Sequence, residues 1–239
     1  GGCTIMPLKV ADSGGSLFFS YIQNALIYAA DNGAHIASMS FGASIASDPA
    51  TDAALDYAWN AGVVLLAATG NENASTVSYP AIHPNVIGVG AASPCGDRKR
   101  SSSNTGELNP GVNPDPNGYT CDGERWWGSN YGVATPDDPG AVDVIAPTIM
   151  PTTDLLGAAG YDPGDWSKWF NGTSCATPYA AGVCGLIKSA FPWYTNAEIR
   201  DALKQTAQDI VNVESGAGWD RYTGYGMVDA YAAAASGPY

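Results

Sequence analysis

The eight residues 171–178, Asn-Gly-Thr-Ser-Cys-Ala-Thr-Pro, have the types and spacing to present one hydroxyl group for chemistry. Ser174 carries that hydroxyl, and Gly172 permits a sharp backbone turn close to another group. Pro178 is typical of the first turn of a helix, and the small or apolar residues that run to Ala190 predict a helix buried on every side. A serine at its start is held rigidly near the positive end of the helix dipole. Read alone, the same residues also fit a simple helix cap.

Alternating strand and helix patterns must position this serine. The expected strands are residues 4–10, 36–40, 63–67, 86–91 and 142–145. Helical spacing begins at Ser16 and stops at Asn-Gly 32–33, and it recurs through Leu55 to about Gly62. Thr195 and Glu198 have capping-box spacing before a further helix. The alternation predicts an α/β fold with a mostly parallel sheet, whose ligands gather beyond the carboxyl ends of the strands.

Three blocks of the chain resemble the subtilisin-like serine proteases, or subtilases. They are Ala-Ala-Thr-Gly-Asn-Glu at 67–72 with Ser-Tyr-Pro-Ala at 78–81, Gly-Thr-Ser-x-Ala-Thr-Pro-x-x-Ala-Gly at 172–182, and Tyr-Gly-Met-Val-Asp-Ala at 225–230. In that family these are the oxyanion-hole segment, the nucleophile segment and the stretch that closes the catalytic domain. The resemblance runs from about residue 4 to 235 and omits an insertion near 93–130.

The resemblance implies one domain over 1–239, the C-terminal part of a subtilase catalytic domain with a three-layer fold and helices on both faces of the sheet. It implies a serine endopeptidase that forms an acyl-enzyme on Ser174, with the Asn71 amide and the Ser174 N–H stabilising the oxyanion. Asn71 also fits a plain turn asparagine after Gly70. The alternative function is a catalytically inactive subtilase-like module for binding or structure.

A serine hydroxyl needs a base, normally a histidine oriented by a carboxylate. The family's Asp and His belong to segments before the expected strand 4–10, and neither segment is in this sequence. His35 and His83 match neither position, so we expect them to be structural or solvent-exposed. The family's Asp-bearing strand lies between the strands at 4–10 and 36–40, and its loss leaves backbone groups unpaired at about 1–3 kcal/mol each. We expect an N-terminal segment, on a separate cleaved chain or outside this sequence, to complete both sheet and triad.

Substrate contacts also follow from the resemblance. An extended peptide is expected to add as a strand beside two backbone edges. These edges are Gly15, Ser16 and Leu17 on one side and Ser40, Phe41 and Gly42 on the other. The pocket for the residue before the cut is expected to be lined by Phe41, Gly42, residues 67–70 with Ala68 and Gly70 among them, and Ser78. Its small walls predict room for a large apolar side chain.

Composition limits the partners. Of 239 residues, 45% are hydrophobic and only 14% charged, and 23 acidic against 10 basic residues give a formal net charge of −13. Such a chain repels nucleic acid and anionic membranes, so neither is an expected partner. The basic run 98–100 is expected to be a solvated loop. The chain starts with Gly-Gly and shows no leader, so we expect a processed or excised piece of a secreted or extracytoplasmic protein.

Five cysteines support the same location. Cys95 and Cys121 bracket a loop-rich stretch and are expected to form a disulfide, worth roughly 3 kcal/mol. The roles of Cys3, Cys175 and Cys184 stay open, although the helix geometry that exposes residue 174 turns Cys175 inward, against a cysteine protease. No cofactor is required. The family often binds structural calcium, and Asp137, Asp138 and Asp143 could contribute to such a site. The sequence has no calcium-binding run of acidic residues, however, and these three also fit a solvated acidic loop.

Overall fold

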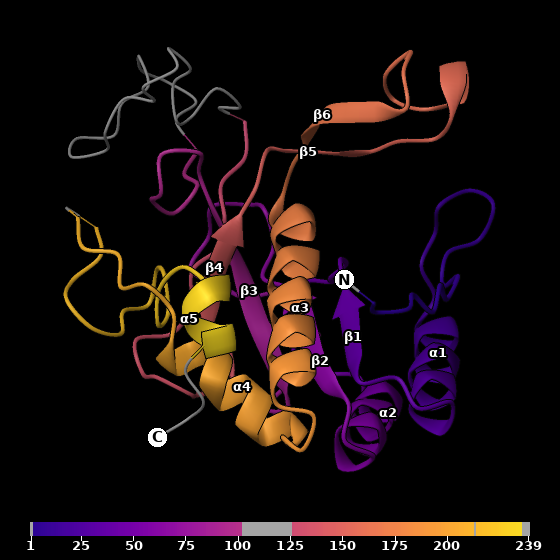
Figure 1. Cartoon of the computed structure of the whole chain (residues 1–239), viewed down its shortest axis with the longest axis horizontal. Helices are drawn as coiled ribbons and strands as arrows, with labels where there is room; N and C mark the ends of the chain where they lie inside the picture. The colour runs from indigo at the N-terminus through magenta and orange to yellow at the C-terminus, as the bar shows by residue number, and fades with distance from the viewer. Residues whose placement is uncertain (1, 102–125, 213, 236–239) are drawn as a thin grey trace.

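The computed structural model describes residues 2–101, 126–212 and 214–235, and these form an α/β fold (Figure 1). The elements in chain order are α1 (Phe19–Asp31), β1 (Ile36–Met39), α2 (Pro49–Asn60), β2 (Val64–Ala68), β3 (Val86–Ala92), β4 (Val144–Pro147), β5 (Met150–Thr153), the 3₁₀ turn η1 (Gly157–Ala159), β6 (Trp166–Phe170), α3 (Thr173–Ala190), α4 (Asn196–Gln205) and α5 (Ala230–Ala235).

Four parallel strands form the central sheet in the order β1-β2-β3-β4. Ile36 pairs with Val64 in the first ladder, and Leu65 pairs with Val86 in the second. Within the described residues β1 pairs with β2 alone, so its other edge is open. The carboxyl ends of β1 and β2 therefore lie side by side, and the residues that follow them meet at one end of the sheet.

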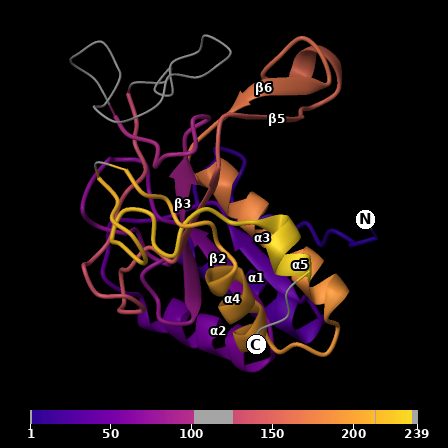
Figure 2. The same ribbon diagram turned by 60° about the vertical axis from the view of Figure 1, so that its left-hand side comes forward.

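Helices cover both faces of this sheet. Val64 and Leu66 of β2 pack in one core cluster with α3, α4 and α5, while Leu65 and Ala67 face a second cluster with α1 and α2. This alternation is what a parallel strand buried on both faces requires. Figures 1 and 2 show α3 crossing one face with α1 and α2 on the other. The predicted three-layer α/β fold is confirmed.

The prediction of a strand at 4–10 is wrong. This stretch has no strand in the structure, and Ile5 is 86% exposed. A strand requires a neighbour for its N–H and C=O groups, and no described strand lies beside this segment. Within the described residues, neither the segment 4–10 nor the open edge of β1 has a strand beside it.

The helix that carries Ser174 differs from its prediction in two ways. It begins at Thr173, so Pro178 lies inside it rather than at its start. Pro178 is still in the second turn, where its ring faces solvent. The helix is also not buried on every side, because Tyr179 and Leu186 are 44% and 43% exposed. By contrast, the capping box of Thr195 and Glu198 at the start of α4 is confirmed.

The hairpin of β5 and β6 was not predicted from the sequence. Its two strands are antiparallel and project away from the body directly before α3 (Figure 2). Asp154 accepts the backbone N–H groups of Leu155 and Asp162 at its tip, 2.8 and 2.9 Å away. The Asp154 carboxylate thus stabilises the turn of the hairpin. The strands themselves show no clear alternating pattern in the sequence, which is why they were not predicted.

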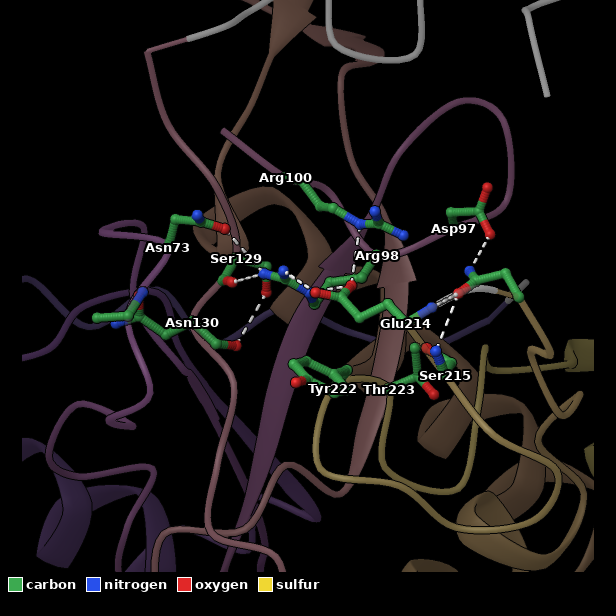
Figure 3. A network of polar contacts seen from close by, with 12 residues as sticks. Asn73, Asp97, Arg98, Arg100, Ser129, Asn130, Glu214, Ser215, Tyr222 and Thr223 are labelled. Atoms are coloured by element: carbon green, nitrogen blue, oxygen red, sulfur yellow. Dashed lines mark hydrogen bonds and ion pairs between the residues drawn. The ribbon is translucent and has the colours of Figure 1, made fainter. Parts of the chain in front are cut away.

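The prediction that residues 98–100 form a solvated loop is also wrong. Arg98, Lys99 and Arg100 are 3%, 0% and 9% exposed. Glu214 lies 2.6 Å from Arg98 and 2.9 Å from Arg100 and supplies the charge that permits this burial (Figure 3). The Lys99 ammonium donates to the carbonyl of Trp127 at 3.0 Å. Buried cations require such partners, and the sequence did not reveal them.

Candidate active site

Ser174 lies at the amino-terminal end of α3, at the carboxyl-terminal end of the sheet. It is the second residue of the helix, so its N–H has no carbonyl partner within the helix. Gly172 caps the helix with φ of 87°, a left-handed region that favours glycine. The Ser174 hydroxyl donates to the Ser40 carbonyl at 3.1 Å, and the Ser40 hydroxyl donates to the Ser174 carbonyl at 2.8 Å. The end of β1 thus holds the serine at a partly exposed position.

Asn71 follows β2 and is fixed against the same helix end. Its Oδ1 accepts the backbone N–H of Thr173 at 2.8 Å and the Thr173 hydroxyl at 3.0 Å. Thr173 is fully buried, and its Oγ1 also accepts the N–H of Gly70 at 3.3 Å. Since Oδ1 is held in this way, the direction of the Asn71 amide nitrogen is set. The sequence did not single out Thr173 except as an alternative helix cap.

The carboxamide of Asn71 and the backbone nitrogen of Ser174 both lie beside Gly172. A Cβ atom added there would lie 3.3 Å from Nδ2 of Asn71 and 3.5 Å from the backbone nitrogen of Ser174. Among the described residues, Nδ2 of Asn71 donates to no acceptor, and the Ser174 N–H is free of the helix ladder. Donors arranged beside a nucleophile can stabilise negative charge that develops on a carbonyl oxygen during attack.

The two predicted peptide-binding edges border one pocket. It has a volume of about 160 Å³ and is lined by Leu17 from the first edge and by Phe41 and Gly42 from the second. Ile22, Phe19 and Tyr79 form its apolar wall. Gly15 and Ser16 precede Leu17 in a turn that folds back on Asp12, whose carboxylate accepts the N–H of Ser16 at 2.8 Å. The structure brings these segments together beside Ser40.

Only some of the residues predicted to line the pocket for the residue before the cut lie together at the surface. A Cβ on Gly42 would lie 2.8 Å from Cβ of Ser78, and a Cβ on Gly70 would lie 2.7 Å from the Ser78 hydroxyl. These three positions therefore meet, and glycine is required for their approach. Ala68 is 4% exposed, so it offers little surface to a ligand.

Neither histidine lies near Ser174. His35 precedes β1 and is exposed, at the amino-terminal end of the sheet. His83 precedes β3, where its Nε2 lies 3.7 Å from Asp56. Both are thus at the opposite end from Ser40 and Asn71. Neither histidine, both of which the structure describes, reaches the Ser174 hydroxyl.

The thiols do not compete with the hydroxyl. Cys175 is 2% exposed, and burial raises its pKa, which disfavours the reactive thiolate. Burial also raises the pKa of Cys184, to about 12. Cys3, Cys175 and Cys184 are free thiols, and Cys3 is exposed. Cys121, the expected partner of Cys95, lies outside the described residues, so that pairing stays a prediction.

A lysine lies among the acidic residues considered for calcium. The Lys204 ammonium is 2.5 Å from Asp137 and 2.8 Å from Asp143. Burial lowers the pKa of Lys204, but these carboxylates outweigh it and the net pKa is raised. Among the described residues, no group of three or more His, Cys, Asp and Glu side chains is placed to hold a metal ion. In the same part of the chain, no helix is both long and apolar enough to cross a membrane.

Comparisons with known proteins agree on one family. A model described as the subtilase family matches residues 1–226. Subtilisin from Bacillus pumilus is 33% identical over 234 residues, which cover 96% of this chain and 67% of that protein. Subtilisin E from Bacillus subtilis (strain 168) is 32% identical over 235 residues, 97% of this chain but 49% of its own length.

A solved structure shows the same relationship. The structure titled Sphericase superposes with a TM-score of 0.67 at 26% sequence identity and covers 92% of this chain and 66% of its own chain. The present chain thus spans about half the length of Subtilisin E and of several other curated relatives.

Proposed function

The chain belongs to the subtilase family, and we propose that it is the serine-bearing part of a serine endopeptidase. Ser174 Oγ attacks the carbonyl carbon of a peptide bond while a base takes its proton. The leaving amine departs with a proton, and water then releases the acyl group from Ser174. The observation that carries the proposal is the proximity of the Asn71 amide and the Ser174 N–H to one another at the hydroxyl-bearing helix end.

The proposal includes an N-terminal segment of the same protease that brings the missing Asp and His. The open edge of β1 supports this, because a strand added there would pair its unsatisfied N–H and C=O groups. It would also lie next to Ser40, whose carbonyl accepts the Ser174 hydroxyl in this chain. The chain composition of the purified protease shows whether this segment is a separate cleaved chain or part of the same polypeptide.

The substrate is a peptide or protein chain held in extended form. The pocket of about 160 Å³ beside Leu17 and Phe41 supports recognition of an apolar side chain there. Ser78 and Gly70 line the adjoining site for the residue before the cut. The reaction needs no cofactor, and the composition supports a secreted or extracytoplasmic location with a disulfide between Cys95 and Cys121.

Labelling with a fluorophosphonate tests the function. The full-length protease is expected to react at Ser174 and nowhere else, and Ser174→Ala abolishes the reaction. Asn71→Ala is expected to lower kcat by about 10²–10³ with little change in KM, the loss known for this donor in subtilisin. A full-length protein whose Ser174 does not react would instead be the inactive binding module.

A further inference from the structure

The buried side chain of Asn130 makes several hydrogen bonds to the loop that carries Asn71. It is 2% exposed and lies at the end of the insertion, far from the oxyanion segment in sequence. Its Oδ1 accepts the N–H groups of Glu72 at 3.0 Å and of Ala74 at 2.9 Å. Its Nδ2 donates to the Thr69 carbonyl at 3.3 Å and to Oε2 of Glu72 at 2.6 Å. One carboxamide thus spans the loop from residue 69 to residue 74.

Glu72 links Asn130 to the backbone of Asn71 itself. The same Oε2 that Asn130 binds accepts the backbone N–H of Asn71 at 2.9 Å. The Asn71 carbonyl in turn accepts the N–H of Gly128 at 3.2 Å, and Asn130 N–H donates to the Gly70 carbonyl at 3.0 Å. The segment 128–130 therefore holds the backbone of Asn71 on one side, while Thr173 holds its side chain on the other.

Buried charge fixes the other end of this segment (Figure 3). Arg98 donates to Oδ1 of Asn73 at 3.0 Å and to the Ser129 carbonyl at 2.5 Å. Two further Arg98 nitrogens bind Glu214 at 2.9 and 2.6 Å, and the guanidinium lies over Tyr131 and Tyr222. A planar guanidinium held on both edges has little freedom to move. Arg98 thus joins Ser129, next to Asn130, to Asn73 in the Asn71 loop.

We propose that Asn130 is a positioning residue for the oxyanion donor Asn71. Its carboxamide fixes the Glu72 carboxylate and the loop backbone, so that Nδ2 of Asn71 stays directed to the same point as the Ser174 N–H. The inference rests on the proposed function, because it concerns a donor used in that reaction. Donors to a developing oxyanion act only when they are aligned before the reaction, so a looser loop lowers kcat rather than substrate binding.

A double-mutant cycle in the full-length protease tests this. Asn130→Ala is expected to lower kcat for a peptide p-nitroanilide by about tenfold or more, yet less than the 10²–10³ lost with Asn71 itself. KM is expected to stay within about twofold. In the Asn71→Ala background the same change is expected to cost less than about twofold, since the donor it positions is gone. Equal losses in the two backgrounds would overturn the proposal.

Variants of exposed Glu72 provide a test that does not disturb the core. Glu72→Gln keeps an oxygen that accepts both N–H groups and is expected to retain kcat, whereas Glu72→Ala is expected to lower it severalfold. Unchanged kcat in Glu72→Ala would refute the positioning role even if Asn130→Ala fails to fold.

The matched control is Asn196→Ala. Asn196 donates to the Trp59 carbonyl at 2.7 Å, at the opposite end of β2, so its loss is expected to lower the melting temperature but not kcat. Fluorophosphonate labelling of the unmutated protease separates the two hypotheses. An unlabelled Ser174 rejects the proposed function, while a labelled Ser174 with additive losses rejects only the role of Asn130.

Discussion

Replacing Gly172 by alanine is the most direct test of the geometry around Ser174. The residue has φ of 87° and ψ of 167°, a region populated almost only by glycine, so a side chain there costs about 1–3 kcal/mol of folding free energy. The new methyl would also contact Nδ2 of Asn71 at 3.3 Å and the Ser174 nitrogen at 3.5 Å, so it competes for the space between the two donors. Both stability and turnover are therefore expected to fall.

The sizes of these two effects differ enough to be separated. For a chain of this length, each kcal/mol corresponds to about 2–4 °C in melting temperature. Interference with one oxyanion donor lowers kcat by about 10²–10³, and here both donors are affected. Calorimetry of the full-length protease measures the first effect, and active-site-titrated turnover measures the second.

Gly182→Ala is the matched control. Gly182 lies in α3, and a Cβ added there meets no atom within 4 Å. Because alanine is the better helix former by about 1 kcal/mol, this variant is expected to melt slightly higher with unchanged kcat. If Gly172→Ala behaves like Gly182→Ala, the reasoning from backbone conformation and donor geometry is refuted.

Three further predictions follow from other parts of the structure. Lys204→Met is expected to destabilise the fold by about 3 kcal/mol because Asp143 loses its partner. Since the pKa of Lys204 is raised in the folded state, the stability difference from the unmutated protein is largest where Lys204 and its carboxylate partners are all charged, and it shrinks as pH rises through the folded-state pKa of Lys204. A difference that stays the same up to alkaline unfolding would contradict this reasoning. Dithiobisnitrobenzoate at pH 8 is expected to label Cys3 but not Cys184 in the native protein, and to find three thiols in unreduced, denatured protein; five would exclude the Cys95–Cys121 disulfide. Phe41→Ala is expected to widen the pocket of about 160 Å³ that Phe41 lines, and to raise by about tenfold the kcat/KM for peptides that place tryptophan there over peptides that place leucine there; an unchanged ratio would remove Phe41 from that pocket.

Local signals predicted the parts of the fold that depend on near neighbours. Thr195 and Glu198 are three residues apart, and their capping box is present in the structure. The strands β2 and β3 could be predicted from their own residues, because a strand that is covered on both faces is apolar along its whole length. The serine and asparagine of the site were found through motifs of adjacent residues.

The features that the sequence did not predict depend on residues far away in the chain. Arg98 is buried because Glu214, 116 residues away, pairs with it, and the spacing of charges near Arg98 carries no trace of that pairing. Asn130 makes hydrogen bonds to Ala74 and Thr69, which lie 56 and 61 positions earlier in the chain, and its own surroundings look like an irregular loop in the sequence. The segment 4–10 has a strand-like pattern, but its conformation depends on a neighbour that the described residues do not supply.

The two ends of the insertion are hydrogen-bonded to one another as well as to the core. Ser129 N–H donates to the Lys99 carbonyl at 2.8 Å, and the Ser129 hydroxyl accepts the N–H of Ala91 in β3 at 2.9 Å. Whatever joins these stems must start and finish at two neighbouring fixed points. Doubling the length of such a connection costs only about 0.6 kcal/mol of closure entropy. Because both stems are fixed in this way, the free energy of closing the connection depends only weakly on its length.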